Sequence, residues 1–135
     1  MRISTKIHGY LDYIVALGLI AAPLILSQAP YGAETWVPVG LGIATIIYSL
    51  FTDYENGYFR KMSMRAHLGL DVMNGVFLAV SPWLFGFADH IWVPYVVVGL
   101  IEIMVPALTN PYPSYESKKT TEQSHASGSR QQNIA

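Results

Sequence analysis

Four long apolar runs limit the folds open to this chain more than any other feature of its sequence. They cover residues 9–26, 36–52, 68–87 and 91–108. A helix needs about 20 residues to cross the hydrocarbon core of a bilayer. Only 13% of the residues are charged, against about 25% in soluble domains, which leaves too little polar surface to coat a soluble core. The sequence therefore predicts an all-α membrane protein with four transmembrane helices.

The distribution of lysine and arginine predicts how these helices cross the membrane. All eight lie in the N-terminus, in the connection between the second and third runs, or in the C-terminal tail: Arg2, Lys6, Arg60, Lys61, Arg65, Lys118, Lys119 and Arg130. Because lysine and arginine accumulate on the cytoplasmic side, we expect both termini in the cytoplasm and a multi-pass location in the cytoplasmic (inner) membrane. Trp36, Trp83 and Trp92 then lie at the outer interface, which suits indole rings.

Composition and motifs also exclude several classes of function. A net charge of −1 gives no reason to expect nucleic acid as a partner. The chain has no cysteine, which excludes disulfides, thiolate metal sites and cysteine nucleophiles. No nucleophile elbow, phosphate loop or dinucleotide fingerprint is present. The sequence therefore predicts neither catalytic residues nor a cofactor, and the protein is not expected to be an enzyme.

The first half of the chain recurs in the second half. An alignment that places His8 on His67 also places Asp12 on Asp71, and the Trp-Val-Pro of residues 36–38 recurs at residues 92–94. Each repeat is then a two-helix hairpin, and an even number of spans makes the two repeats parallel. The repeats cover about residues 2–54 and 61–110 of a membrane domain at residues 1–110. Residues 111–135 are polar, which predicts a disordered cytoplasmic tail.

The third run carries a family resemblance. The stretch HLGLDVMNGVFLAVSPWLFGF, with Ser81, Pro82 and Trp83 near its end, resembles the SPW-repeat family of small bacterial integral membrane proteins over about residues 2–110. The first repeat reads APLIL in place of SPWLFGF, so that only Pro23 of the motif remains there. The resemblance implies a membrane location and a repeat fold. It implies no established reaction and brings no catalytic residues.

Acidic residues and histidines in the apolar runs are the candidate functional residues. His8 and Asp12, like His67 and Asp71, are four residues apart and share one helix face. Glu102, in the descending fourth run, lies at about the same depth, on the order of 9 Å from the inner helix end. The second run offers only Thr45 or Ile46 opposite it. Intramembrane acids usually face the bundle interior or water.

Three interpretations of these five residues stay open. In the first, the aspartates pair with Lys6, Arg65 or the nearby histidines, benefit from the helix dipole and fix the packing of the repeats. In the second, the histidines and aspartates of both repeats converge and bind a divalent transition metal. In the third, the same residues and Glu102 conduct protons or ions.

The sequence favours a structural or accessory membrane component, with a small proton or ion conduit or a metal-binding membrane protein as the alternative. Its expected partners are the lipid bilayer and, in addition, further copies of the chain or other membrane proteins. Pro82 should free a backbone carbonyl, for which the Ser81 hydroxyl is the candidate partner. Glycines within the runs are expected at close helix contacts: Gly18, Gly42, Gly75 and Gly99.

Overall fold

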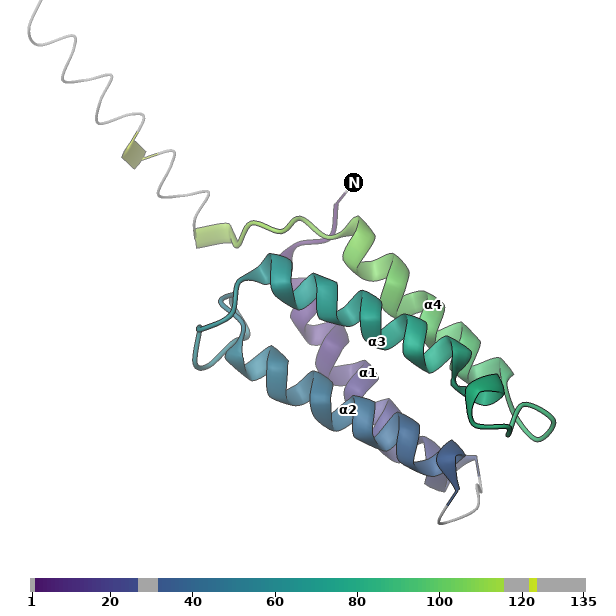
Figure 1. The fold of residues 1–135 in the computed structure, drawn as a ribbon. Coiled ribbons are helices and arrows are strands. Elements are labelled where there is room, and N and C mark those ends of the chain that lie inside the picture. Colours follow the sequence, from purple (N-terminus) through teal and green to yellow (C-terminus); the bar gives the residue numbers. More distant parts are fainter. Residues whose placement is uncertain (1, 27–31, 116–121, 124–135) are drawn as a thin grey trace, which may run out of the picture.

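The fold of this chain is a bundle of four helices arranged as two hairpins (Figure 1). The computed structural model describes residues 2–26, 32–115 and 122–123. The helices are α1 (Thr5–Ile25), α2 (Ala33–Phe51), α3 (Met64–Leu84) and α4 (Val93–Leu108). The described residues form no strand, only two isolated bridges, between Ile3 and Thr109 and between Thr52 and Met62. The all-α prediction is confirmed.

Serine caps explain where the first helix of each hairpin begins. The hydroxyl of Ser4 accepts a hydrogen bond from the backbone N–H of Ile7, and that of Ser63 accepts one from Ala66, both at 3.3 Å. Such caps satisfy backbone donors that the first turn leaves without a partner. Helices α1 and α3 therefore begin several residues before the apolar runs do, and the turns that carry His8 and His67 are helical.

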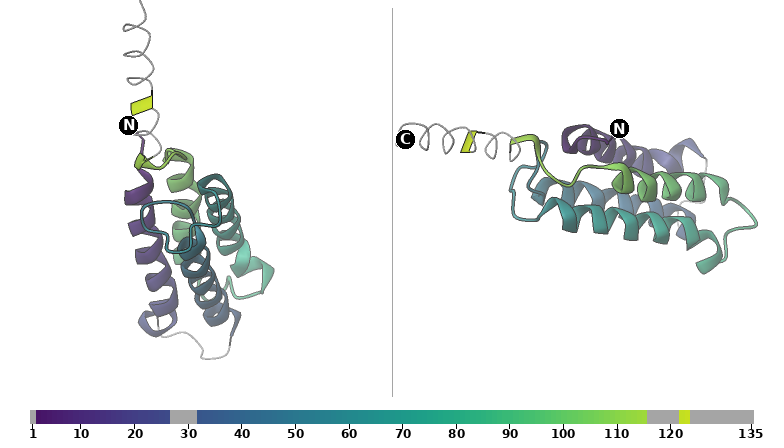
Figure 2. Two further views of the ribbon diagram at one scale, coloured as in Figure 1. Left: turned by 90° about the vertical axis from the view of Figure 1, so that its left-hand side faces the viewer. Right: turned by 90° about the horizontal axis from the view of Figure 1, so that it is seen from above.

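The duplication seen in the sequence is also present in the packing. In the register that pairs His8 with His67, the buried Ala16 of α1 is equivalent to the buried Gly75 of α3. Buried positions of α2 recur in α4 in a second register, which pairs Gly42 with Gly99. The Trp-Val-Pro match is one residue out of step with this second register. The most extensive contacts lie within each hairpin, α1 with α2 and α3 with α4, and the two hairpins run side by side (Figure 2).

Three of the four expected glycines are indeed points of close helix contact. A Cβ added at Gly75 would lie 2.6 Å from the carbonyl oxygen of Gly99, and one at Gly42 would lie 2.6 Å from that of Ala16. Real Cβ atoms do not approach this closely, so only glycine allows these backbones to meet. Gly18 differs, because a Cβ there would meet no atom within 4 Å. The prediction of close packing was wrong for Gly18, which borders a cavity instead.

The proline at the end of α3 behaves as the sequence predicted. Pro82 has no N–H to offer the carbonyl of Leu78, and the Ser81 hydroxyl donates to that carbonyl at 2.7 Å. The helix therefore continues to Leu84 despite the proline. Trp83 is exposed and its ring lies 5.9 Å from that of Trp92. The motif residues Ser81, Pro82, Trp83 and Pro23 thus lie in the last turns of α1 and α3, at the end opposite the histidines.

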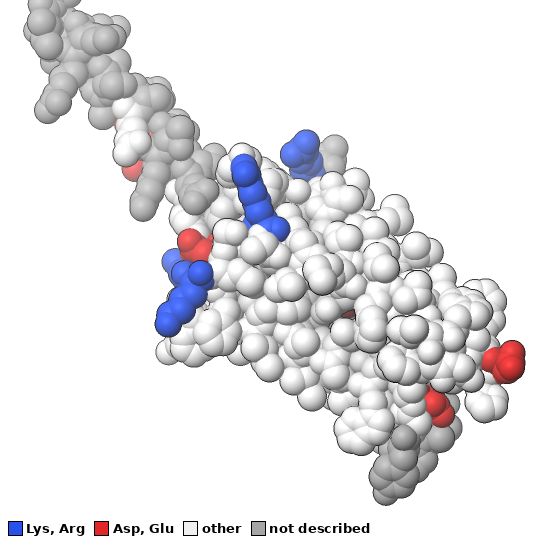
Figure 3. Space-filling model, viewed as in Figure 1, with Lys and Arg blue, Asp and Glu red and all other residues white. Residues whose placement is uncertain are grey.

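The outward surface of the bundle is apolar. Helices α1 and α2 are long and apolar enough to cross a membrane, and α4 is apolar but shorter. Only 28% and 22% of the apolar windows of α1 and α2 are buried, whereas the core helix of a soluble protein would be mostly buried. In the view of Figure 3, cationic side chains gather at one end of the bundle, next to an acidic one, and the opposite end shows acidic side chains alone.

The start of the predicted tail packs against the bundle. Arg65 donates to the hydroxyl of Tyr112 at 2.6 Å, and the hydroxyl of Tyr115 donates to the carboxylate of Asp53 at 2.6 Å. These tyrosines, at the start of the segment predicted to be a disordered tail, thus have partners on the loop and on α3. Most of the remaining tail, residues 116–121 and 124–135, lies outside the described residues.

Candidate metal centre

Helices α1 and α3 bring the two His–Asp pairs together on the axis between the repeats. His8 and Asp12 lie one turn apart on α1, and His67 and Asp71 lie one turn apart on α3; all four are buried. One nitrogen or oxygen atom from each of the four residues lies within 4.8 Å of those from the others. We call these four residues the His–Asp cluster.

The closest contacts in the His–Asp cluster cross from one repeat to the other. The Nε2 atom of His8 lies 2.9 Å from Oδ2 of Asp71, and Nε2 of His67 lies 3.0 Å from Oδ2 of Asp12. Within a repeat the distances are longer, 3.3 Å from His8 to Asp12 and 3.2 Å from His67 to Asp71. The two Nε2 atoms are 3.3 Å apart. Both imidazoles therefore direct the same nitrogen toward one centre.

Two threonines determine which ring nitrogen of each histidine points to the centre of the His–Asp cluster. Thr109 donates its hydroxyl proton to the carbonyl of Val105, and Thr52 donates its own to the carbonyl of Tyr48, both at 2.7 Å. Each threonine oxygen lies 2.9 Å from a histidine Nδ1, that of Thr109 from His8 and that of Thr52 from His67. Since a hydroxyl has one proton to donate, each Nδ1 must be the donor. The second nitrogen, Nε2, is then free to bind at the centre.

A hydrogen-bonded network closes one side of the His–Asp cluster. The Tyr48 hydroxyl donates to Oδ1 of Asp71 at 2.6 Å. The amide of Asn74 donates to the Tyr48 hydroxyl at 3.2 Å and to the Thr45 hydroxyl at 3.3 Å. This network occupies the space between α2 and α3 and fixes the orientation of the Asp71 carboxylate.

Glu102 lies beside the His–Asp cluster rather than in it. Its side chain is 9% exposed, and its Oε2 has no hydrogen-bond partner among the described residues. It lines a cavity of about 50 Å³ together with His8, Asp12 and Asp71. The sequence-predicted residues therefore divide into four that converge and a fifth that borders the same small cavity.

Of the partners expected for the aspartates, the histidines lie beside them, and lysine and arginine do not. Within the described residues, the ion-pair partners of Asp12 and Asp71 are the two histidines. Lys6 is exposed, and Arg65 turns outward to the ring and hydroxyl of Tyr112. The aspartates lie six residues further along their helices than these cations, nearly two turns deeper.

Sequence reasoning missed Thr52, Thr109 and Tyr48. The two threonines cap the C-termini of α2 and α4, and they are equivalent in the register that pairs Gly42 with Gly99. The Trp-Val-Pro match differs from this register by one residue, which leaves the threonines unmatched. A comparison of the two repeats that allows a shift of one residue would have matched Thr52 with Thr109.

A loop carboxylate ties the polar end of the bundle together. Glu55 accepts hydrogen bonds from the Thr5 hydroxyl and, at 2.8 Å, from the backbone N–H of Ser114. Burial by itself would raise the pKa of Glu55, but these hydrogen bonds outweigh it and hold the pKa below its ordinary value. Beside Glu55 the buried Tyr54 places its ring 5.5 Å from that of His67, so the loop between α2 and α3 covers one end of the His–Asp cluster.

Comparison with known protein families agrees with this architecture. The family model of the SPW repeat domain matches residues 6–109, from the second residue of α1 to the C-cap of α4. The chain belongs to the SPW repeat family. No curated protein and no solved structure matches it. Membership of the SPW repeat family and the apolar helices indicate a membrane protein, and the match contains all four members of the His–Asp cluster.

Proposed function

We propose that this SPW repeat protein crosses the bacterial cytoplasmic membrane four times and binds one divalent transition-metal ion, with zinc as the best fit, at the His–Asp cluster. The observation that carries the proposal is the convergence of two imidazole nitrogens and two carboxylates within 4.8 Å. In this proposal the chain is a binding protein and not an enzyme.

The distances from the two histidine nitrogens to their neighbours in the cluster are close to those of a tetrahedral ligand set. Ligand atoms about 2.0–2.1 Å from a tetrahedral zinc ion lie about 3.3–3.4 Å from one another. The five distances between histidine nitrogens and their neighbours in the cluster run from 2.9 to 3.3 Å. The contacts of the histidine nitrogens therefore need an expansion of a few tenths of an ångström to hold an ion, and the four ligand atoms as a set, which lie within 4.8 Å of one another, close around it by adjustment of the carboxylates.

The chemistry of the cluster supports the same conclusion. Two neutral imidazoles and two carboxylates carry two negative charges, which a divalent cation balances, and a buried charge needs such compensation. Hydrogen bonds from Nδ1 to Thr52 and Thr109 are the outer-shell contacts that orient metal-binding histidines. Imidazole and carboxylate together suit zinc, manganese or iron, and the tetrahedral spacing favours zinc.

A structural role is the second candidate, and the cross-repeat contacts favour it. When protons occupy the places between nitrogen and oxygen, the same four residues clamp one repeat to the other at 2.9 and 3.0 Å. A proton conduit has less support, because the core beyond the cluster is formed by apolar side chains: Ala16, Leu19, Leu78 and Phe87. Four spans with both termini in the cytoplasm agree with the cationic end seen in Figure 3.

Metal binding to the purified protein tests the proposal. In nanodiscs, zinc titration followed by calorimetry and metal analysis should give one ion per chain. His67→Ala should weaken zinc binding by more than about 100-fold, because removing a ligand exceeds the 10–100-fold effect of losing an outer-shell partner. His90→Ala is the matched control, since His90 is exposed in the loop before α4, and its affinity should equal that of the wild type. Equal zinc binding by all three proteins, or none by the wild type, would leave only the structural role.

A further inference from the structure

The two flanks of the His–Asp cluster differ, although the repeats are related. Between α2 and α3, Thr45, Tyr48 and Asn74 form the hydrogen-bonded network that fills the space. The repeat registers pair Thr45 with Glu102, Tyr48 with Val105 and Asn74 with Val15. Glu102, Val105 and Val15 therefore stand in the corresponding places on the flank between α1 and α4. The second flank therefore has no polar network among the described residues, and the 50 Å³ cavity bordered by Glu102 lies there.

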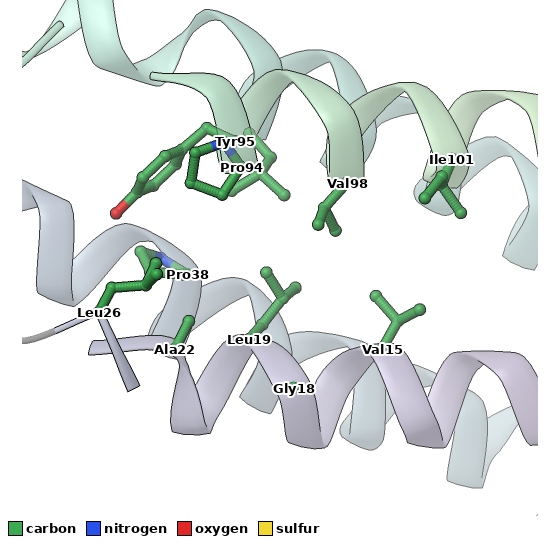
Figure 4. Close-up of a pocket in the computed structure, with 11 residues that line it drawn as sticks. Val15, Gly18, Leu19, Ala22, Leu26, Pro38, Pro94, Tyr95, Val98 and Ile101 are labelled. Carbon is green, nitrogen blue, oxygen red and sulfur yellow. The ribbon is translucent and has the colours of Figure 1, made fainter. Parts of the chain in front are cut away.

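A larger cavity lies next to this small one, toward the outer end of the bundle. It has a volume of about 250 Å³ and shares Val15 and Ile101 with the cavity at Glu102. Figure 4 shows its walls: Val15 and Leu19 of α1 face Val98 and Ile101 of α4. The lining is almost wholly apolar and includes Gly18, whose missing side chain leaves the space open.

The opposite flank differs in its lining. The depression between α2 and α3 is lined by Trp36, Phe77, Phe85 and small or aliphatic residues, and no member of the His–Asp cluster borders it. Phe77 stands at the repeat position of Gly18. Divergence of the repeats has thus given the two flanks different linings. The depression between α2 and α3, of about 480 Å³, is separate from the His–Asp cluster, whereas the cavity between α1 and α4 adjoins the one at Glu102.

We infer that the cleft between α1 and α4 binds a single-chain lipid alcohol, with its hydroxyl on Glu102 and its apolar chain in the larger cavity. Glu102 supplies a buried carboxylate oxygen without a partner among the described residues at the inner end. A hydroxyl both donates and accepts, so it pairs with a carboxyl group in either protonation state. The cavity is smaller than the roughly 300–1,000 Å³ of sites for drug-sized ligands, which suits one narrow chain. This binding requires no metal.

Photolabelling tests the inference directly. The protein in phosphatidylcholine nanodiscs is irradiated with hexadecanol that carries a diazirine in mid-chain, and the labelled peptides are identified by mass spectrometry. Labelling should saturate, should fall on the α1 and α4 segments that contain Leu19 and Val98, and should be competed by unlabelled hexadecanol but not by hexadecane. Labelling that is unsaturable, or spread evenly over the lipid-facing surface, would overturn the inference.

Matched variants separate the chain site from the hydroxyl site. Gly18→Leu fills the cavity and should abolish saturable labelling, whereas Gly40→Leu, where a Cβ also meets nothing within 4 Å, should leave it unchanged. Glu102→Leu should remove the preference for hexadecanol over hexadecane, and Glu102→Gln, which still donates and accepts, should keep it. Unchanged saturable labelling in Gly18→Leu, or an unchanged preference in Glu102→Leu, contradicts the inference.

Zinc titration of the same samples distinguishes this inference from the proposed metal site. Gly18→Leu should bind zinc as the wild type does, because Gly18 lies outside the His–Asp cluster. If zinc fails to bind while labelling saturates, the metal proposal fails and the lipid site stands. If zinc binds while labelling does not saturate, the lipid site fails and the metal proposal stands.

Discussion

The hydroxyls of Thr52 and Thr109 decide which ring nitrogen of each histidine reaches the centre of the bundle. Each hydroxyl proton is committed to a carbonyl at the end of its own helix, so the hydroxyl can only accept from histidine. Without these acceptors, neutral His8 and His67 would be free to adopt the other tautomer, in which Nε2 carries the proton and cannot bind a metal.

Removing one of these hydroxyls should therefore weaken metal binding while leaving the ligands in place. Thr109→Val is expected to lower zinc affinity about 10–100-fold, the usual effect of losing an outer-shell partner. Thr109→Ser keeps the hydroxyl and should bind zinc as the wild type does. Competition with a chromogenic chelator gives both affinities. Equal affinities for the valine and serine variants would show that the contact with Nδ1 plays no part.

Glu55 should make a pH-dependent contribution to stability. Its pKa in the folded protein lies below the ordinary value of 4.5, so the folded state favours the ionised form. The stabilisation is complete above the unfolded-state pKa and is lost as the pH falls through the folded-state pKa. Glu55→Gln should lower the free energy of unfolding at pH 7 by less than about 1 kcal/mol, because the site is partly exposed. The difference should shrink as the pH is lowered below 4.5, and thermal unfolding of both proteins over a series of pH values measures it.

For single residues, the sequence predicted the acidic and imidazole side chains of the site but not the hydroxyl groups that hydrogen-bond to them. His8, Asp12 and their repeats stand out because ionisable groups in apolar helices are costly and therefore rare. Thr52 and Thr109 do not stand out, because threonine is common at helix ends. Among the alternative partners expected for the aspartates, the histidines are buried beside them, whereas the exposed Lys6 keeps its hydration.

Among the helices, the contact between α3 and α4 depends on two glycines that face each other. A Cβ at Gly75 would lie 2.6 Å from the carbonyl oxygen of Gly99, whereas one at Gly69 on the same helix meets nothing within 4 Å. Gly75→Ala should therefore destabilise the protein by about 1–3 kcal/mol through backbone displacement. Gly69→Ala should be neutral or stabilising by up to about 1 kcal/mol, because alanine favours helix. Unfolding in detergent compares the two, and equal effects would contradict the close contact.

The helices themselves were predictable from length and hydropathy, but their exact packing was not. The four apolar runs correspond to α1 to α4. Helices α1 and α3 begin earlier than their apolar runs because Ser4 and Ser63 cap them there. The cavity at Gly18 could not be predicted, because a glycine at a contact and a glycine beside a void look alike in sequence. Only the packing of α1 against α4 distinguishes them.

For the whole molecule, the distribution of charge predicts that the loop between α2 and α3 is cytoplasmic. The chain has no cysteine, so single cysteines introduced at exposed loop positions report on sidedness. Asp89→Cys should react with a membrane-impermeant maleimide in intact cells, and Tyr58→Cys should react only after permeabilisation. The reverse pattern would invert the topology, and reaction of both in intact cells would contradict a four-span arrangement.

The repeat architecture was visible in the sequence, but its functional consequence was not. The match between the sequences of α1 and α3 placed the His–Asp pairs on equivalent faces, and the structure brings those faces together. The difference between the two flanks follows from Tyr48, Asn74 and Glu102, which lie at positions where the repeats have diverged. A comparison of repeats finds similar residues more readily than such differences.

X-ray absorption at the zinc edge of the loaded protein tests the central claim, a metal centre shared by the two repeats, most directly. The account predicts four nitrogen or oxygen ligands at about 2.0–2.1 Å, with the multiple scattering of two imidazole rings, reduced to one ring in His67→Ala. A first shell of about six oxygens without imidazole scattering, unchanged in His67→Ala, would show that zinc binds elsewhere and would contradict the account.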